Sequence, residues 1–338
     1  MALSAAVLFC ASTPLAKWLL QGISPWLLAG VLYLGSGIGM TLLYKLSAQP
    51  QSSIPRNELA WLIVAIVCGG LIAPVLLMVG LTATGASNAS LLLNAEAVFT
   101  ALIAWYVFRE NVDRRIALGL LAIVAGAVVL SWPSDHGPAR LKAPLAILAA
   151  CLAWGIDNNL TRKVSLTDAR RVAGLKGLCA GIVNIALAMF MGAKIPALST
   201  LGIALLVGWL CYGVSLALFV VALRLLGTAR TGAYFSVAPF FGALLSVVLF
   251  GEPLTISLLI AGALMAIGVW LHVTEHHSHL HTHEPLEHVH EHEHDEHHQH
   301  DHDETVAGAE GKHRHWHRHD PLTHAHPHYP DMHHRHSH

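Results

Sequence analysis

The sequence contains few charged residues. Only 12% of its 338 residues are Asp, Glu, Lys or Arg, while 54% are hydrophobic and the mean hydropathy is +0.53. A soluble domain usually carries about 25% charged residues. The composition therefore excludes an ordinary soluble domain and predicts a membrane protein whose main partner is the lipid bilayer.

Signatures of enzymes and of nucleotide-driven pumps are also absent. The chain has no GxxxxGK[ST] loop for ATP and no GxSxG nucleophile motif, so we expect neither an ATP-driven pump nor an enzyme. Nothing in the sequence indicates a required cofactor or a nucleic-acid partner. The first apolar run lacks a preceding basic region and leads directly into further apolar runs, which favours a spanning helix over a cleaved signal peptide.

Cysteine is scarce, and its spacing carries no metal or redox motif. The five cysteines all lie in apolar runs and none forms a CxxC pair. We interpret them as small apolar packing residues, not as disulfides or zinc ligands. They are Cys10, Cys68, Cys151, Cys179 and Cys211.

Long apolar runs, by contrast, fill most of the chain. A helix needs about 20 apolar residues to cross the hydrocarbon region of a bilayer. The sequence predicts an all-α membrane protein with ten transmembrane helices. Their expected residues are 3–20, 25–44, 59–80, 86–108, 116–132, 143–161, 170–192, 199–223, 229–250 and 255–273.

Lysine and arginine are unevenly divided among the predicted loops. The loops after the second, fourth, sixth and eighth spans carry eleven of them, whereas the opposite loops carry only Arg140, Lys142 and Lys194. Cytoplasmic loops of membrane proteins are enriched in these residues. We therefore expect a protein of the cell (inner or plasma) membrane with both termini in the cytoplasm.

The two halves of the apolar region resemble each other. A shift of 142 residues aligns Gly85 with Gly227, Phe99 with Phe241 and Glu110 with Glu252. Five spans in each half would insert the halves, residues 1–132 and 143–273, with opposite orientations. Such inverted repeats are typical of secondary transporters, whose solute site lies near the middle of the membrane between the repeats.

Two segments carry a resemblance to a known family. "NAEAVFTALIAWYVFRENVDRRIALGLLAIVAGAVVL" and "APFFGALLSVVLFGEPLTISLLIAGALMAIGVWL" resemble the two EamA-type halves of the drug/metabolite transporter superfamily, and "AACLAWGIDNN" resembles the Trp-Gly element of such a half. The resemblance covers residues 1–273. It implies ten helices, cytoplasmic termini and secondary transport, often export, of small organic solutes.

The chain departs from this family pattern at one position. The family's proline on the fourth helix of a half is present as Pro239, but the matching residue of the first half is Ala97, so the bend expected there is absent or has another cause. We interpret Pro239, together with Glu110 and Glu252 at helix ends, as structural residues that a helix cap or an ion pair would explain.

Five polar residues inside predicted spans are candidates for a solute path. A charged group at the bilayer centre costs roughly 2.5–3.5 kcal/mol on insertion scales, which favours a functional role. The candidates are Glu96, Lys17, Asp157, Asn94 and Asn158. Lys17 would attract an anionic group, and Glu96 or Asp157 would bind an amine or carry a proton. Alternatively, Lys17 extends to the interface and Asp157 faces cytoplasmic water.

The C-terminal tail differs from the rest of the chain. Residues 272–338 hold 25 of the 26 histidines, 13 acidic residues and only 4 basic ones. We expect residues 274–338 to be disordered, because nothing in them could form a core. Imidazoles interleaved with carboxylates suit Zn²⁺, Ni²⁺, Co²⁺ or Cu²⁺. The expected ligands are His277, His279, His281, His283, His288, His290, His292, His294, His298, His300, His302, His313, His315, His317 and His319.

The membrane region and the tail indicate different cargoes. The spans are poor in histidine and carboxylate, whereas a dedicated metal path would need such ligands at paired helical spacing. We therefore favour a transporter of a small organic metabolite, with a tail that binds metal for regulation or buffering. The alternative is a divalent-metal exporter whose tail collects the cargo. A metal store or sensor with a membrane anchor would not need an inverted repeat, and a passive tail stays open.

Overall fold

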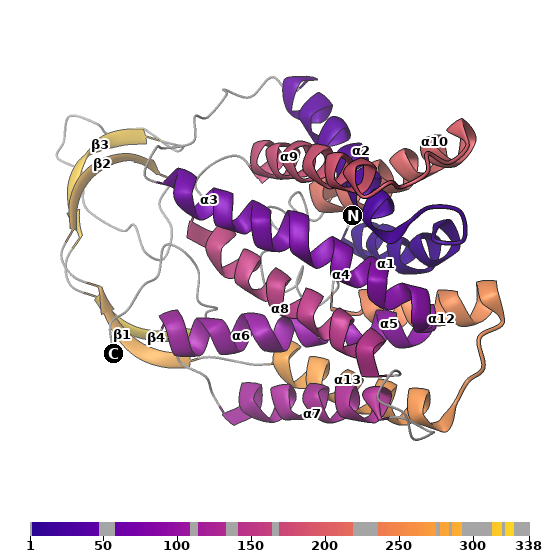
Figure 1. Ribbon diagram of the computed structural model, residues 1–338. Helices are drawn as coiled ribbons and strands as arrows, with labels where there is room; N and C mark the ends of the chain where they lie inside the picture. The colour runs from indigo at the N-terminus through magenta and orange to yellow at the C-terminus, as the bar shows by residue number, and fades with distance from the viewer. Residues whose placement is uncertain are drawn as a thin grey trace. The chain divides into compact units, whose positions relative to one another are not determined.

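The computed structural model describes residues 2–46, 58–108, 114–132, 141–163, 169–218 and 236–274, and in the tail 278–283, 286–292, 313–319 and 322–327. The chain separates into two compact units, residues 1–275 and 276–338. The first unit is a bundle of helices, and the tail contributes the strands (Figure 1).

Apolar helices of the first half follow the predicted spans. Most side chains in them are aliphatic, so each helix can bury one side against its neighbours and leave the other for lipid. The helices are α1 (Ala2–Leu19), α2 (Pro25–Leu46), α3 (Leu59–Ala65), η2 (Ile66–Ile72), α4 (Ala73–Ala83), α5 (Ala86–Leu92), α6 (Ala95–Phe108) and α7 (Arg114–Ser131).

The second half is also built of apolar helices within its described residues. Its helices are α8 (Lys142–Lys163), α9 (Ala169–Phe190), α10 (Leu198–Val207), η4 (Gly208–Val214), α12 (Ala238–Phe250) and α13 (Ile256–Val273). Across the described residues, seven helical segments are long and apolar enough to cross a membrane. Three shorter apolar helices, Ser4–Leu19, Ala238–Phe250 and Ile256–Leu271, lie on the other predicted spans.

Two π-helical segments give the internal repeat a structural counterpart. η2 and η4 each have seven residues, and a shift of 142 residues superposes their bounds, Ile66–Ile72 and Gly208–Val214. Each lies against the opposite half, because η2 packs on α8 and α9 while η4 packs on α1 and α2. A π segment widens the helix and frees backbone groups, and it often occurs at functional sites. The halves therefore meet at equivalent irregular segments.

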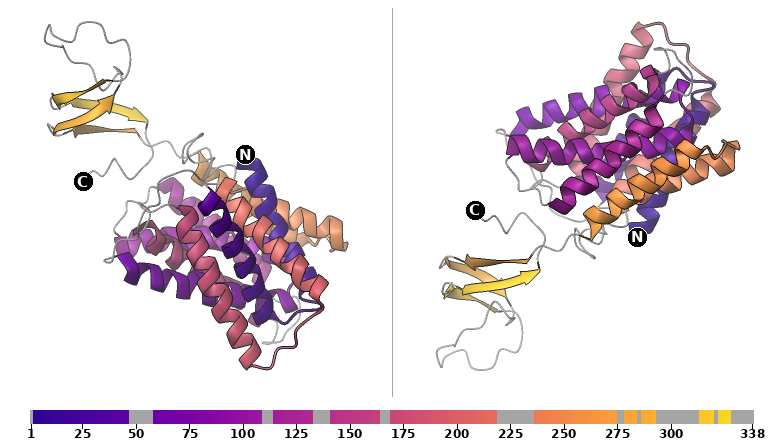
Figure 2. Two further views of the ribbon diagram at one scale, coloured as in Figure 1. Left: turned by 90° about the horizontal axis from the view of Figure 1, so that it is seen from above. Right: turned by 90° about the horizontal axis from the view of Figure 1, so that it is seen from below.

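Small residues allow helices of the two halves to approach closely. A Cβ atom on Gly37 of α2 would lie 2.3 Å from the Leu178 amide nitrogen of α9, and a Cβ on Gly177 would lie 2.6 Å from the Gly37 Cα. Glycine at such crossings is the usual means of close packing between membrane helices. α7 and α13, also from different halves, lie side by side as well (Figure 2).

The fourth span is interrupted by a turn that contains no proline. α5 ends at Leu92 and α6 begins at Ala95, so two residues in a turn separate them. The Leu91 carbonyl oxygen at the end of α5 accepts from the Asn94 backbone amide and from Asn94 Nδ2, both at 3.0 Å, and the Asn94 side chain is buried. In the second half, Pro239 occupies the first turn of α12, where its missing N–H costs nothing. The two halves thus carry different residues at matching places, with Asn94 in the turn before α6 and Pro239 in the first turn of α12.

The tail contains strands where disorder was expected. β1 (Ser278–His283) pairs antiparallel with β4 (Leu322–Pro327), and β2 (Leu286–His292) pairs antiparallel with β3 (His313–His319). The prediction of disorder is wrong for these four segments. Histidine alternates there with polar, charged and apolar residues, and such a period of two matches a strand.

Candidate functional site

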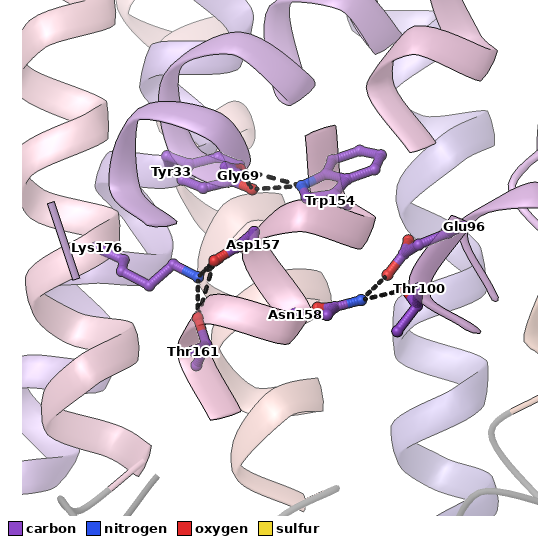
Figure 3. Close-up of polar contacts among 9 residues, drawn as sticks. All are labelled: Tyr33, Gly69, Glu96, Thr100, Trp154, Asp157, Asn158, Thr161 and Lys176. Carbon is purple, nitrogen blue, oxygen red and sulfur yellow. Dashed lines mark hydrogen bonds and ion pairs between the residues drawn. The ribbon is translucent and has the colours of Figure 1, made fainter. Parts of the chain in front are cut away.

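A buried ion pair lies between two neighbouring helices of the second half. Lys176 Nζ on α9 is 2.5 Å from Oδ1 and 2.6 Å from Oδ2 of Asp157 on α8 (Figure 3). The Thr161 hydroxyl, one turn further along α8, donates to Asp157 Oδ1 at 2.9 Å. The Asp157 and Lys176 side chains are only 8% and 16% exposed. Each charge therefore has its counterion inside the bundle.

Both members of the pair lie well inside their helices. Asp157 is six residues from the end of α8, about 9 Å at the helical rise, and Lys176 is seven residues from the start of α9, about 10 Å. An unpaired charge at this depth would cost several kcal/mol of free energy, and pairing lowers that cost for both residues. The prediction for Asp157 omitted Lys176. Lys176 could have been recognised from the sequence as a candidate, because it is the lone charged residue within an apolar run.

Gly69 provides the space for the Asp157 carboxylate. A Cβ atom on Gly69 of η2 would lie 1.9 Å from Asp157 Oδ2, far closer than any contact distance. The Gly69 carbonyl oxygen accepts from the Tyr33 hydroxyl at 2.7 Å and from Trp154 Nε1 at 3.0 Å. A π-helix leaves carbonyl groups available for such bonds. The π segment of the first half is thereby tied to α2 of its own half and to α8 of the other.

The second carboxylate of the region, Glu96, has no cation among the described contacts. It lies in the first turn of α6, where the positive end of the helix dipole favours a negative charge. Asn158 Nδ2 on α8 donates to Glu96 Oε1 at 2.8 Å and also approaches the Thr100 hydroxyl at 3.3 Å. Glu96 is half-buried, whereas Asn158 is exposed. This carboxylate is thus the more accessible of the two.

These groups form one cluster that joins the halves, which we name the polar centre. Three of its elements, α2, η2 and α6, belong to the first half, and two, α8 and α9, belong to the second (Figure 3). Its residues are Tyr33, Gly69, Glu96, Thr100, Trp154, Asp157, Asn158, Thr161 and Lys176. The centre offers an accessible carboxylate and amide for a solute beside an ion pair that is already satisfied.

Some predicted path residues lie outside the polar centre. Asn94, in the turn between α5 and α6, donates from Nδ2 to the Leu91 carbonyl oxygen of α5 and approaches Met265 Sδ of α13 at 3.8 Å. The Lys17 ammonium group lies outside the polar centre and donates to backbone carbonyl oxygens at the end of α4. Glu252 caps the start of α5. Glu110 and the histidines at 277, 294, 298, 300 and 302 lie outside the described residues.

No group of three or more His, Cys, Asp and Glu side chains that could hold a metal ion occurs in the part of the chain that the structure describes. The two carboxylates of the polar centre, Asp157 and Glu96, each have a protein partner. The chemistry of the polar centre is therefore that of hydrogen bonding and charge pairing.

Comparison with known proteins identifies the class. The chain matches the EamA-like transporter family over residues 1–132 and 141–274. These segments cover most of the chain, so the protein belongs to the EamA-like transporter family. The match confirms the resemblance noted in the sequence. The protein is accordingly a multi-pass membrane transporter and not an enzyme.

Two relatives and one solved structure are similar to this chain. An uncharacterized transporter of Methanothermobacter thermautotrophicus is 28% identical over 288 residues, which cover 80% of this chain and 84% of the relative. The probable 4-amino-4-deoxy-L-arabinose-phosphoundecaprenol flippase subunit ArnE of Pseudomonas fluorescens is 36% identical over 83 residues, 25% of this chain and 72% of its own. One solved structure, described as a crystal structure of protein, aligns with 80% of this chain and 94% of its own chain, with a TM-score of 0.61 and 20% sequence identity. The two proteins share a fold.

Proposed function

We propose that the protein is a secondary transporter that exports a small organic metabolite by alternating access across the cell membrane. In this proposal ten helices form two inverted halves, and the solute binds at the polar centre. The observation that supports it most directly is the accessible Glu96 carboxylate, held by Asn158 across the boundary between the halves. A solute that contacts both residues would respond to any relative motion of the halves.

The groups of the polar centre have separate roles in this proposal. Glu96 and Asn158 bind the solute, with Glu96 taking an amine or another hydrogen-bond donor, or a coupled proton. The Asp157 carboxylate accepts from both Lys176 and Thr161, so it is less available to a solute. We assign that ion pair to holding α8 against α9. Tyr33 and Trp154 keep the π segment of the first half in contact with the second through the Gly69 carbonyl.

The test compares cells with and without the protein. A metabolite survey of the growth medium should find a solute that accumulates only when the protein is present. Glu96→Gln keeps the shape of the side chain and an oxygen that can accept from Asn158, but it removes the negative charge. It should therefore abolish that accumulation at normal expression. Glu58→Gln, a carboxylate change at the start of α3, is the matched control and should leave export intact. Unchanged export and unchanged pH dependence in Glu96→Gln would refute the assignment.

Orientation belongs to the same proposal. The excess of Lys and Arg in alternate loops supports cytoplasmic termini. A reporter fused after Trp270 should then be active only if it is one that functions in the cytoplasm. A second reporter, one that functions only outside the cytoplasm, should be inactive when fused after Trp270. If it is active, the topology is reversed and the tail lies outside the cytoplasm.

For the tail we propose binding of divalent transition ions, as a regulator or buffer rather than as the permeation path. The specific support is the strand register, which repeatedly sets histidine opposite histidine. The pairs are His288 and His317, His290 and His315, His292 and His313, His279 and His326, and His281 and His324. In this proposal the two histidines of such a pair share one ion. A metal exporter is less well supported, because Asp157 is already paired with Lys176 and the described residues bring no three metal-ligating side chains together.

A further inference from the structure

One carboxylate of the second half binds the start of a helix of the first half. Glu252 follows α12, and its Oε1 accepts from the Ala86 amide at 2.7 Å while its Oε2 accepts from the Ser87 amide at 3.0 Å. The Ser87 hydroxyl also donates to Oε2. Ala86 and Ser87 are buried, and Glu252 is half-buried. Three donors on one carboxylate make a strong, charge-assisted contact between the halves.

Gly85 makes this contact geometrically feasible. A Cβ atom at Gly85 would lie 2.9 Å from Glu252 Oε2 and 3.3 Å from both Cδ and Oε1. The backbone there has φ −59° and ψ 147°, which any residue can adopt, so glycine is not needed for conformation. Its small size is what lets the carboxylate reach the amides. The sequence carries the same residue types at the matching positions of the repeat, Gly227 and Glu110.

Lys17 holds the other side of the same turn. Its Nζ donates to the carbonyl oxygens of Leu81 at 2.5 Å and Thr84 at 3.0 Å, at the C-terminal end of α4. A cation suits those free carbonyls, as a carboxylate suits the amides that begin α5. Lys17 and α4 belong to the same half, so this contact fixes the turn without joining the halves. The bond that must break when the halves separate here is the one to Glu252.

We propose that Glu252 is the gate of this end of the transporter, with Lys17 as the positioning residue that presents the turn to it. The proposal rests on alternating access as stated above. The end that carries Gly85 is closed while Glu252 binds the Ala86 and Ser87 amides, and it opens when those bonds are released. Weakening the contact shifts the population of the protein toward the state open at this end.

The test measures access to a native cysteine and needs no solute. Cys151 is buried, with its Sγ 3.6 Å from the Leu92 carbonyl oxygen, close to the bend beside Glu96. A membrane-impermeant maleimide would be added to right-side-out and to inside-out vesicles, and labelling of Cys151 would be followed by peptide mass spectrometry. Glu252→Gln and Gly85→Ala should each raise the labelling rate from one side by about tenfold, because both weaken the same charged hydrogen bonds.

Two further variants complete the design. Lys194→Gln removes an exposed charge from the loop between α9 and α10 and should label as the unaltered protein does. Glu252→Asp retains the charge with a shorter reach and should label at an intermediate rate, which keeps the test informative if Glu252→Gln does not fold. Hydrogen exchange of the Ala86 and Ser87 amides should rise in parallel.

The outcomes separate this proposal from the one on which it rests. Unchanged labelling in both Glu252→Gln and Gly85→Ala would overturn the gate, even if Glu96→Gln abolishes export and so upholds the transport site. Equal increases from both sides, with a lower melting temperature, would also overturn it, since they would indicate general loosening. One-sided labelling with export unaffected by Glu96→Gln would uphold the gate and reject the polar centre as the solute site.

Discussion

The Lys176 ammonium group contacts both carboxylate oxygens of Asp157, at 2.5 and 2.6 Å, between the apolar helices α8 and α9. Each residue alone would place a net charge inside the bundle, and together they place none. Removing one partner of a buried pair typically costs about 3–5 kcal/mol, because the other charge is left unpaired. Replacing both partners by uncharged groups costs much less.

Asp157→Asn or Lys176→Met alone should therefore lower the free energy of unfolding by roughly 3–5 kcal/mol, or prevent stable insertion. The double variant Asp157→Asn/Lys176→Met should recover most of that loss. Thermal unfolding of the purified protein in detergent measures both effects. Additive losses in the double variant would show that the two residues do not depend on each other.

Replacement of Gly69 by alanine should disrupt the polar centre. The new Cβ would overlap Asp157 Oδ2, at 1.9 Å, so either the ion pair or the π segment must shift. We expect a loss of roughly 1–3 kcal/mol in unfolding free energy, as for other overpacked sites, and a loss of transport. Gly202→Ala in α10 is the matched control, because its Cβ would meet no atom within 4 Å. An equal effect of both changes would contradict the steric explanation.

The Gly69 carbonyl should need at least one of its two donors. Tyr33→Phe and Trp154→Phe each leave one bond to the carbonyl oxygen, and each should cost about 0.5–1.5 kcal/mol. The double variant leaves this acceptor without either donor, so its loss should exceed the sum of the single losses. Denaturation of the three variants forms a double-mutant cycle. A sum equal to the double loss would mean that the donors act independently.

Much of the helical unit was predictable, because apolar runs of membrane length leave the backbone few alternatives to a helix. The helices lie on the predicted runs, and the resemblance to the EamA family was correct. The π segments were not predicted. Their wider turns arise where η2 and η4 pack against the opposite half, and this contact is not encoded in the pattern of either segment alone.

The candidate site was predictable only in part for a similar reason. Glu96, Asp157 and Asn158 are recognisable from charge or polarity within apolar runs. Lys176 was overlooked, because its partner lies on the preceding helix and the pairing appears only when α8 and α9 pack. The turn at Asn94 was not predicted, because no proline or glycine marks it in the sequence and a hydrogen bond to the Leu91 carbonyl accompanies it. Lys17 looked like a path residue, although backbone carbonyls are its partners.

The tail allows a prediction that separates regulation from permeation. Deletion of residues 276–338 removes the whole second unit and leaves the helical unit, so the shortened protein should still insert and fold. It should still export its solute but with an altered response to external metal. Stability of the truncated protein in detergent and its export in cells are the two measurements. Loss of metal resistance on truncation, with no organic solute found in any survey, would instead support metal export.

The metal itself can be tested on the tail as part of the whole protein. Full-length protein in detergent should bind several Zn²⁺ or Ni²⁺ ions at pH 7.5, whereas the form truncated after residue 275 should bind few. Only neutral imidazole ligates a metal, and its ordinary pKa is about 6.5, so binding should persist above that pH and be lost near pH 5 as the histidines gain protons. Isothermal titration calorimetry at the two pH values measures this.

Replacing the paired histidines of β2 and β3 by glutamine should remove more binding than replacing an equal number outside the strands, if the register brings the ligands together. Equal losses would mean that composition alone, rather than strand pairing, determines the affinity.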